Sequence, residues 1–420
     1  MNKRTFIKHL TLGCMSSALF LEQISALAQS VAHLSPQDVA QDEDFWLKIR
    51  SGYRLKPDYI NLEGGYYCMM PQEILENYLQ HIRDVNYQHS YYMRTVQFNN
   101  KHRMQERLAE LAGCSADELI ITRNTTESLD TIIGGFPWKA GDEAVMAAQD
   151  YGAMLDMFAL QARRHGVVNK IISLPNHPAS DEEIVDLYAQ AITSKTRLLM
   201  VCHLVNITGQ ILPVRKITDM AHSRRVEVMV DGAHAFAHIR FSIEALGCDY
   251  YGASLHKWLS VPLGAGILYV KKEKIPQIWP MFAEEGLQED DLRRLNHTGT
   301  HPVATDLAIQ DALDYYYHLG AERKEARLHY LQQYWTSRVR ELPHIILNTP
   351  ADPQRHGAIG NVGIQGIEPG TLAKMLLDKY QIWTVAIDRP GVKGVRITPN
   401  IYTTTKELDI LVKALKELKN

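Results

Sequence analysis

The sequence predicts an α/β protein with a mostly parallel sheet, helices on both faces of that sheet, and a smaller α+β domain toward the C-terminus. Short apolar runs alternate with helical patterns from residue 61 onward, which is typical of strands connected by helices. One such run, Arg197–Leu204, is apolar without alternation, as expected of a strand covered on both faces. The chain has 420 residues, 45% of them hydrophobic, which is enough for two associated domains.

The larger domain is expected to occupy residues 61–306. In chain order, its strands are predicted at Glu118–Thr122, Glu143–Ala147, Lys170–Leu174, Arg197–Leu204, Val226–Val230 and Gly266–Val270. Helical patterns lie between them, from near Thr125, through Met157 and Ala162, and over Val214–Arg224. Strands separated by helices of this length favour parallel pairing, because each helix returns the chain to the end of the sheet where the previous strand began.

The smaller domain is assigned to residues 307–420. A long helical pattern from about Val303 to Leu342 precedes and enters it. Strand and helix patterns then follow at Ile359–Ile364, Thr371–Lys379, Trp383–Ile387, Gly394–Thr398 and from Thr405. Residues 29–60 form a separate N-terminal segment, which we expect to pack on the small domain.

Residues 1–28 have the pattern of an export signal. The basic start Lys3-Arg4-Thr5-Phe6-Ile7-Lys8 precedes an apolar run that closes on Ala26-Leu27-Ala28. Glu22 and Gln23 interrupt this run, which is also too short to cross a bilayer stably, so we expect no membrane insertion. The start resembles the twin-arginine export signal, with lysine in place of the first arginine, and predicts a periplasmic protein. An ordinary secretory signal is the alternative.

Charge and cysteine content exclude several classes of function. The formal net charge is −3, with mixed signs along the chain, so neither a nucleic-acid nor a membrane-surface partner is expected. Cys14 would leave with the signal, and the other four cysteines form no C-x-x-C pair, so we expect no metal site. Spacing alone does not decide whether any of them form disulfides.

The segment Ser254-Leu255-His256-Lys257-Trp258 carries the first candidate for chemistry. Lys257 follows a strand-like stretch and precedes a glycine-rich return, an unusual place for a solvent-exposed lysine. An amine that forms a Schiff base must be partly desolvated so that its pKa falls. Ser254 and His256 flank it and can hydrogen-bond an anion. A lone lysine in such a loop would more often be an ordinary surface residue.

A carboxylate lies upstream in Val228-Met229-Val230-Asp231-Gly232-Ala233-His234. Asp231 ends a buried strand, and the carboxyl ends of parallel strands are the usual place for a ligand. Such a carboxylate can keep a pyridinium nitrogen protonated, so that the ring acts as an electron sink. His234 can hydrogen-bond a phenolic oxygen of the same ring. The alternative is an aspartate that caps the next turn.

A third element, Arg123-Asn124-Thr125-Thr126-Glu127-Ser128, lies between a strand and a helix. Hydroxyl groups and free N–H groups at a helix N-terminus form a phosphate site. A plain helix cap, made by Asn124 with Glu127 three residues on, is the alternative.

In this order, the three motifs resemble those of fold-type I enzymes that use pyridoxal 5′-phosphate (PLP), specifically the class V aminotransferase group. That group includes cysteine desulfurases, isopenicillin N epimerase and related lyases. The Ser254-Leu255-His256-Lys257 segment is the most specific part, and Asp231 stands at the expected distance from it. The resemblance covers nearly all of the chain after residue 61 and implies a seven-stranded sheet.

The resemblance also implies roles for single residues. Lys257 matches the lysine that binds PLP covalently, and Asp231 matches the partner of the pyridine nitrogen. The phosphate ligands would be Thr125, Ser254 and His256, with the neighbouring Thr126 as a candidate to share this task. Tyr151 falls where the group stacks an aromatic ring on the cofactor, and tyrosine there, in place of the histidine of the desulfurases, favours the epimerase-like branch. A core aromatic is the other interpretation of Tyr151.

Three further residues are matched outside these motifs. Asn206 corresponds to an asparagine near the phenolic oxygen and the substrate carboxylate. Arg396 corresponds to the arginine that grips the substrate α-carboxylate through a bidentate fork, unless it is a strand-edge charge. Gly299-Thr300 corresponds to a loop that touches the phosphate in the partner subunit, so the resemblance implies a homodimer with a shared active site.

The resemblance leaves several activities open. Cysteine desulfurases carry a nucleophilic cysteine in a small-domain loop, whereas this chain has no cysteine after Cys248, so we expect no persulfide route through that loop. Together with the export signal, the Tyr151 branch resembles an exported part of the group that modifies the siderophore pyoverdine. We therefore expect an aminotransferase-like enzyme that acts at Cα of an amino acid or a peptide-linked amino acid. A lyase or epimerase on a free amino acid, and a non-catalytic PLP-fold binding protein, are the alternatives.

Overall fold

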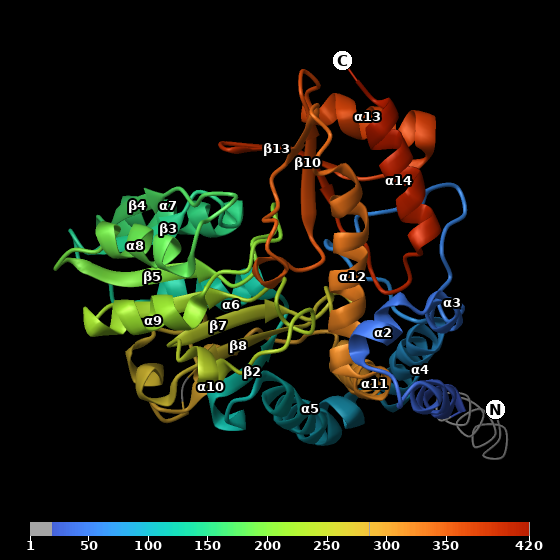
Figure 1. Cartoon of the computed structure of the whole chain (residues 1–420). Coiled ribbons are helices and arrows are strands. Elements are labelled where there is room, and N and C mark those ends of the chain that lie inside the picture. The colour runs from blue at the N-terminus through green and yellow to red at the C-terminus, as the bar shows by residue number, and fades with distance from the viewer. Residues whose placement is uncertain (1–18, 285, 420) are drawn as a thin grey trace, which may run out of the picture.

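The computed structural model describes residues 19–284 and 286–419, and its larger part is built on a seven-stranded sheet (Figure 1). The strand order is β2-β8-β7-β6-β5-β3-β4. The strands are Leu119–Thr122 (β2), Glu143–Ala147 (β3), Val168–Ile172 (β4), Thr196–Cys202 (β5), Glu227–Asp231 (β6), Tyr250–Ser254 (β7) and Gly266–Val270 (β8). From β4 to β7 all neighbours are parallel, whereas β8 is antiparallel to both β2 and β7. The predicted mostly parallel sheet of seven strands is confirmed.

Both faces of the sheet are covered, as the apolar run of β5 predicted. Leu198 and Met200 are buried in one core, together with side chains of α6 (Thr125–Gly135) and α7 (Gly152–His165). Leu199 and Val201 are buried in a second core on the opposite face. The helices that contribute to this second core include α5 (Gln97–Ala112), α8 (Asp181–Ala191) and α9 (Val214–Ser223). Alternate residues of one strand therefore pack into different layers.

Strand positions follow the apolar runs closely. The bounds of β3 and β8 coincide with the predicted ones, and β2, β5 and β6 differ by one or two residues. β4 begins two residues before the predicted Lys170 and ends two residues earlier than Leu174. β7 is the strand-like stretch that precedes Lys257.

The predicted long helix from Val303 to Leu342 is wrong as a single element. It is two helices, α11 (Val303–Leu319) and α12 (Ala321–Val339), separated by Gly320. Gly320 has φ 93°, a conformation that cannot continue an α-helix and that glycine adopts most readily. The domain boundary assigned after Asp306 therefore falls inside α11. α12 runs from beside α2 (Pro36–Gln41) toward the C-terminal sheet (Figure 1).

The C-terminal domain contains a four-stranded antiparallel sheet in the order β12-β13-β10-β9. Its strands are Ile345–Leu347 (β9), Gly360–Ile364 (β10), Val385–Arg389 (β12) and Val392–Ile397 (β13). The helices α13 (Pro369–Tyr380) and α14 (Thr405–Glu417) pack with it around one core. A separate two-stranded sheet pairs β1 (Ile60–Asn61) with β11 (Ile382–Trp383) in parallel, so the boundary assigned before residue 61 falls inside β1.

The N-terminal segment contacts the C-terminal part of the chain. It contains α2 (Pro36–Gln41) and α3 (Glu43–Arg50). Arg50 pairs with Glu407 of α14 at 2.8 Å, and Arg327 of α12 donates to the Ala40 carbonyl at 2.8 Å. The chain also contains the long helix α4 (Gln72–Gln88). Its short elements are α10 (Ile243–Leu246), a π-helix at Tyr92–Val96, and 3₁₀ turns at Ala116–Glu118, Lys272–Gln277, Leu292–Leu295 and Pro353–Arg355.

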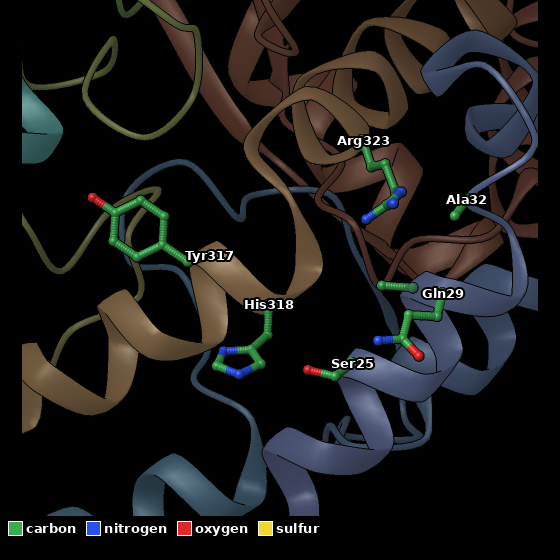
Figure 2. A pocket seen from close by; sticks show the side chains of 7 residues that line it. Ser25, Gln29, Ala32, Tyr317, His318 and Arg323 are labelled. Atoms are coloured by element: carbon green, nitrogen blue, oxygen red, sulfur yellow. The ribbon is translucent and has the colours of Figure 1, made fainter.

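Most of the predicted export signal lies outside the described residues. Within its last part, Phe20 stacks on Tyr315 with ring centroids 5.8 Å apart. Figure 2 shows a surface pocket beside this segment, where Ser25 and Gln29 face His318 and Arg323. None of the predicted site residues lines this pocket. Across residues 19–284 and 286–419, no helix is long and apolar enough to span a membrane.

Candidate active site

The predicted site residues gather where the parallel strands end. β6 ends at Asp231 and β7 at Ser254, and Asp231 lies opposite Gly252 in the register of these two strands. Lys257 lies in the turn that follows β7, and α6 begins at Thr125 just after β2. The fold thus brings three segments that are separate in the sequence to one edge of the sheet, as the carboxyl ends of parallel strands commonly do.

A hydrogen-bond chain holds the Lys257 amine. Its Nζ lies 3.0 Å from Nε2 of His234, and the indole Nε1–H of Trp258 donates to His234 Nδ1 at 3.4 Å. Because an indole nitrogen only donates, His234 Nδ1 is an acceptor, and the proton of the neutral ring is on Nε2. His234 then donates to Lys257, which requires an unprotonated amine.

The electrostatic surroundings favour that protonation state. Burial lowers the pKa of Lys257 to about 8, with the Asp231 carboxylate opposing and the Arg396 charge adding to the shift. Burial also lowers the pKa of His234 well below its usual range, and the charges of Lys257 and Arg396 act in the same direction. Near neutral pH, Lys257 is therefore the free amine that a carbonyl group requires in a minority of molecules, but far more often than an ordinary lysine is.

Asp231 is a buried carboxylate beside this amine. Its Oδ1 accepts a hydrogen bond from the Ala233 N–H at 3.0 Å. Burial raises the pKa of Asp231, while Lys257 and the Ala233 N–H partly offset the rise. A buried carboxylate is most stable with a cationic partner, and a protonated pyridine nitrogen is such a partner.

Two predicted phosphate ligands, Thr125 and Ser254, meet at the N-terminus of α6. The Thr125 and Ser254 hydroxyls are 2.7 Å apart, and the Thr125 N–H donates to Ser254 Oγ at 2.8 Å. Thr126 lies in the same helical turn and is partly buried. His256 Nδ1 is buried without a hydrogen-bond partner among the described residues, and burial lowers the pKa of His256 to about 4.

The plain helix cap, which was the alternative interpretation of this turn, is present together with the Thr125–Ser254 contacts. Asn124 Oδ1 accepts from the Glu127 N–H at 2.9 Å, so the cap is present. The cap uses neither the Thr126 hydroxyl nor the Thr125 hydroxyl, which contacts Ser254. Gly266 allows β8 to approach this turn closely, because a Cβ there would lie 2.7 Å from the Asn124 Cα.

The other predicted residues lie on three separate loops. Tyr151 immediately precedes α7 and is 47% exposed, so it is not a core aromatic. Asn206 follows β5, and its carbonyl accepts from Arg396 Nη1 at 3.1 Å. Thr300 lines a surface cleft beside α5 and has no hydrogen bond to the Lys257 cluster among the described residues. Its expected role across a dimer stays a prediction.

Sequence reasoning missed the partner of Arg396. Arg396, on β13, binds Glu63 through Nε to Oε2 at 3.1 Å and through Nη2 to Oε1. The two side chains are only 7% and 9% exposed, so Arg396 is not a strand-edge charge. Nothing in the local sequence marks Glu63, which reaches Arg396 only because the chain after β1 bridges to Thr398. Trp258 was also missed, although it directly follows Lys257.

The groups present match the aldehyde, the pyridine nitrogen and the phosphate of PLP. The Lys257 amine fits the aldehyde, the Asp231 carboxylate fits the pyridine nitrogen, and the α6 N-terminus fits the phosphate. The unpartnered His256 Nδ1 is an observation in favour of a ligand at that place, since buried polar atoms are normally hydrogen-bonded.

Solved structures with this fold include enzymes of amino-acid sulfur chemistry. A mutant of C-DES with glycine covalently linked to the PLP cofactor aligns with a TM-score of 0.80 and 19% identity, over 88% of this chain and 99% of that one. The cysteine desulfurase CsdA from Escherichia coli aligns with a TM-score of 0.76 and 20% identity, over 88% and 97%. At these identities the likeness shows the fold, which is fold-type I as expected.

Curated relatives are more similar in sequence. The isopenicillin N epimerase of Amycolatopsis lactamdurans is 28% identical over 89% of this chain and 98% of the relative. A probable cysteine desulfurase of Halalkalibacterium halodurans is 27% identical over 73% and 78%. Residues 68–411 match the family model of class V aminotransferases, whose cofactor is PLP. With this match over most of its length, the chain belongs to the class V aminotransferase family.

Proposed function

We propose that this chain is an exported PLP-dependent enzyme that acts at Cα of an amino acid or a peptide-linked amino acid, with aminotransferase-like chemistry. The observation that carries the proposal is the Lys257 amine, hydrogen-bonded to His234 beside the buried Asp231. A non-catalytic binding protein would have no use for an amine kept partly unprotonated by burial. Membership of a PLP-dependent family that acts on amino acids agrees with this proposal.

The residues of the chain divide the chemistry among them. Bound PLP supplies a ring that withdraws electrons from Cα of the substrate. With PLP bound, Lys257 Nζ would be the group that takes the proton from Cα of the substrate or returns one to a neighbouring atom. His234 Nε2 keeps Nζ oriented, and Arg396 with Asn206 lies where a substrate carboxylate would be held.

Epimerisation of a free amino acid is the second candidate. It is favoured by the similarity to two isopenicillin N epimerases, which are 28% and 29% identical to this chain. Both reactions begin with loss of the Cα proton, so Lys257 and Asp231 serve either one. The two reactions would differ in where the proton returns: to the opposite face of Cα in epimerisation, or to an atom other than Cα in transamination.

A screen of amine substrates in deuterated water separates the two candidates. Transamination gives a keto acid and requires an amino acceptor, whereas epimerisation gives the opposite stereoisomer with deuterium at Cα and no keto product. Mass spectrometry with chiral chromatography measures both. The screen should include peptide-linked glutamate, such as the pyoverdine side chain, because the Tyr151 branch and the N-terminal signal support a siderophore substrate. No product from any amine would contradict the proposed function.

Export through the twin-arginine route is a prediction that rests on the first 28 residues. PLP binds the folded protein and stabilises it by mass action, and unfolded translocation would discard that stabilisation. In a strain without the twin-arginine translocase, we expect mature protein to disappear from the periplasm and holoenzyme to accumulate inside. Arg4→Lys should have the same effect in a normal strain. Normal processing in the deficient strain, measured by fractionation, would contradict the prediction.

No cysteine of the described chain is expected to be catalytic. Burial raises the pKa of Cys68 and of Cys114 to about 12, and it raises the pKa values of Cys202 and Cys248 well above the usual range. All four are unpaired, and a thiol with a raised pKa is a poor nucleophile at neutral pH. Changing each to serine or alanine should therefore not approach the roughly 10²-fold loss in kcat that follows removal of a catalytic group. A folded variant with abolished turnover, especially at Cys68, would favour a desulfurase instead.

A further inference from the structure

The arginine assigned to the substrate carboxylate already holds a carboxylate of the chain itself. Glu63 takes the side of the Arg396 guanidinium formed by Nε and Nη2, and Nη1 donates to the Asn206 carbonyl at 3.1 Å. Both charged side chains are more than nine-tenths buried. This side-on arrangement is the bidentate geometry in which a guanidinium binds a substrate carboxylate.

Glu63 is fixed in this position by its backbone. Residues 62–65 lie along the end of β13, where the Thr398 N–H donates to the Leu62 carbonyl at 2.7 Å and the Gly64 N–H to the Thr398 carbonyl at 3.2 Å. The Thr398 hydroxyl donates to the Leu62 carbonyl at 3.1 Å. Because the main chain holds both ends of the pair in register, the contact is built into the fold.

The pair lies within electrostatic reach of the catalytic centre. The Arg396 charge lowers the pKa values of Lys257 and His234, and the Glu63 charge raises the pKa of Cys68. Because the Arg396 charge acts on the Lys257 amine, a substrate bound at Lys257 would also interact with that charge. A substrate carboxylate at Arg396 would thus enter a place that already contains one negative charge, and two carboxylates on one buried guanidinium repel each other.

We propose that Glu63 is a specificity-determining residue that competes with the substrate carboxylate for Arg396. This inference rests on the proposed function. Free amino acids, which depend on that one anchor, bind weakly because they must displace Glu63. A peptide-linked residue brings contacts outside the anchor, and these supply the binding energy for the exchange. The structure thereby selects substrates larger than a free amino acid.

The test uses propionate, which has a carboxylate but no amine and cannot react with the cofactor. Binding to the holoenzyme is measured by titration calorimetry for the wild type and for Glu63→Gln, with propionamide as the neutral probe. Removing the competing charge should lower the Kd for propionate about tenfold or more, the value of one charged hydrogen bond. Propionamide binding should not change. Adding Arg396→Gln to Glu63→Gln should abolish the gain.

Glu143→Gln is the matched control. Glu143 is also a buried carboxylate in an ion pair, with Lys170 at 2.8 Å, but it lies at the first residue of β3, at the end of the sheet opposite the site. Its substitution should leave propionate binding unchanged. Should Glu63→Gln fail to fold by circular dichroism, Glu63→Asp serves in its place: the shorter side chain loosens the contact, so propionate should still bind more tightly than to the wild type.

Weaker or unchanged propionate binding in the folded Glu63 variant would overturn the proposal, because it would mean that Glu63 orients Arg396 rather than competing for it. The proposed function has a separate failure, in which the wild type turns over no amine. Propionate binding does not require turnover, so the titration can still be interpreted if the wild type turns over no amine. Failure of the proposed function and failure of the Glu63 proposal are therefore distinguishable.

Discussion

Replacing Lys257 by alanine is expected to abolish covalent attachment of PLP and to lower kcat by about 10⁴-fold, the upper end of what one proton-transfer group contributes. The reason is that a single amine both binds the aldehyde and moves the Cα proton. Borohydride reduction of the wild type followed by peptide mass spectrometry should label Lys257, and the variant should carry no label.

Lys324 provides the internal control for this labelling. It is also a buried lysine whose pKa burial lowers to about 8, and its ammonium donates to the Trp258 carbonyl. It therefore has a similarly lowered pKa but lacks the hydrogen bond to His234 and the nearby charge of Asp231. Labelling of Lys324 in place of Lys257 would show that the assignment of the Schiff-base lysine is wrong.

The pKa of Lys257 also predicts how cofactor loading depends on pH. Burial disfavours the ammonium and lowers its pKa to about 8, so the reactive free amine increases as pH rises toward that value. The rate at which the apoenzyme takes up PLP should therefore increase up to about pH 8 and level off above it. Stopped-flow absorbance of the bound cofactor measures the rate. A rate that falls over this range would mean that another group controls loading.

Replacing Asp231 by asparagine is expected to lower kcat by about 10²- to 10³-fold, the range for loss of one preorganised electrostatic contact. Asparagine keeps the size and the hydrogen bond from Ala233 but not the charge that favours a protonated pyridine nitrogen. The absorbance of bound PLP should shift as well, because the ring loses its proton. Steady-state kinetics and absorption spectra measure the two effects.

Asp150→Asn is the control for this second prediction. Asp150 is a buried carboxyl close enough to interact with Asp231, and burial raises its pKa to about 8, so it is mostly neutral at pH 7. Its Oδ2 accepts from the Ala147 N–H at 2.8 Å, which an asparagine oxygen can also do. This substitution should therefore leave kcat and the spectrum nearly unchanged. An equal loss in both variants would indicate damage to the fold rather than loss of the Asp231 charge.

The sequence by itself determined the sheet and the centre of the site. Apolar runs located β3 and β8 to the residue, since strands buried on both faces admit few polar side chains. Lys257, Asp231, Ser254 and Thr125 could be placed together because each ends a strand or lies within three residues of a strand end, and β2, β6 and β7 run in the same direction and end at one edge of the sheet. Local patterns suffice when the residues that meet follow strands that end at the same edge.

Only the tertiary structure decided the break at Gly320 and the environment of Arg396. A glycine within a helical pattern is compatible with a continuous helix, and the packing of α11 and α12 in different directions selected the positive φ. Glu63 and Arg396 are 333 residues apart in the chain. Their pairing depends on how residues 62–65 align with β13, a long-range register that no local periodicity encodes. The tertiary structure thereby placed a built-in carboxylate against the arginine that the sequence had assigned to the substrate.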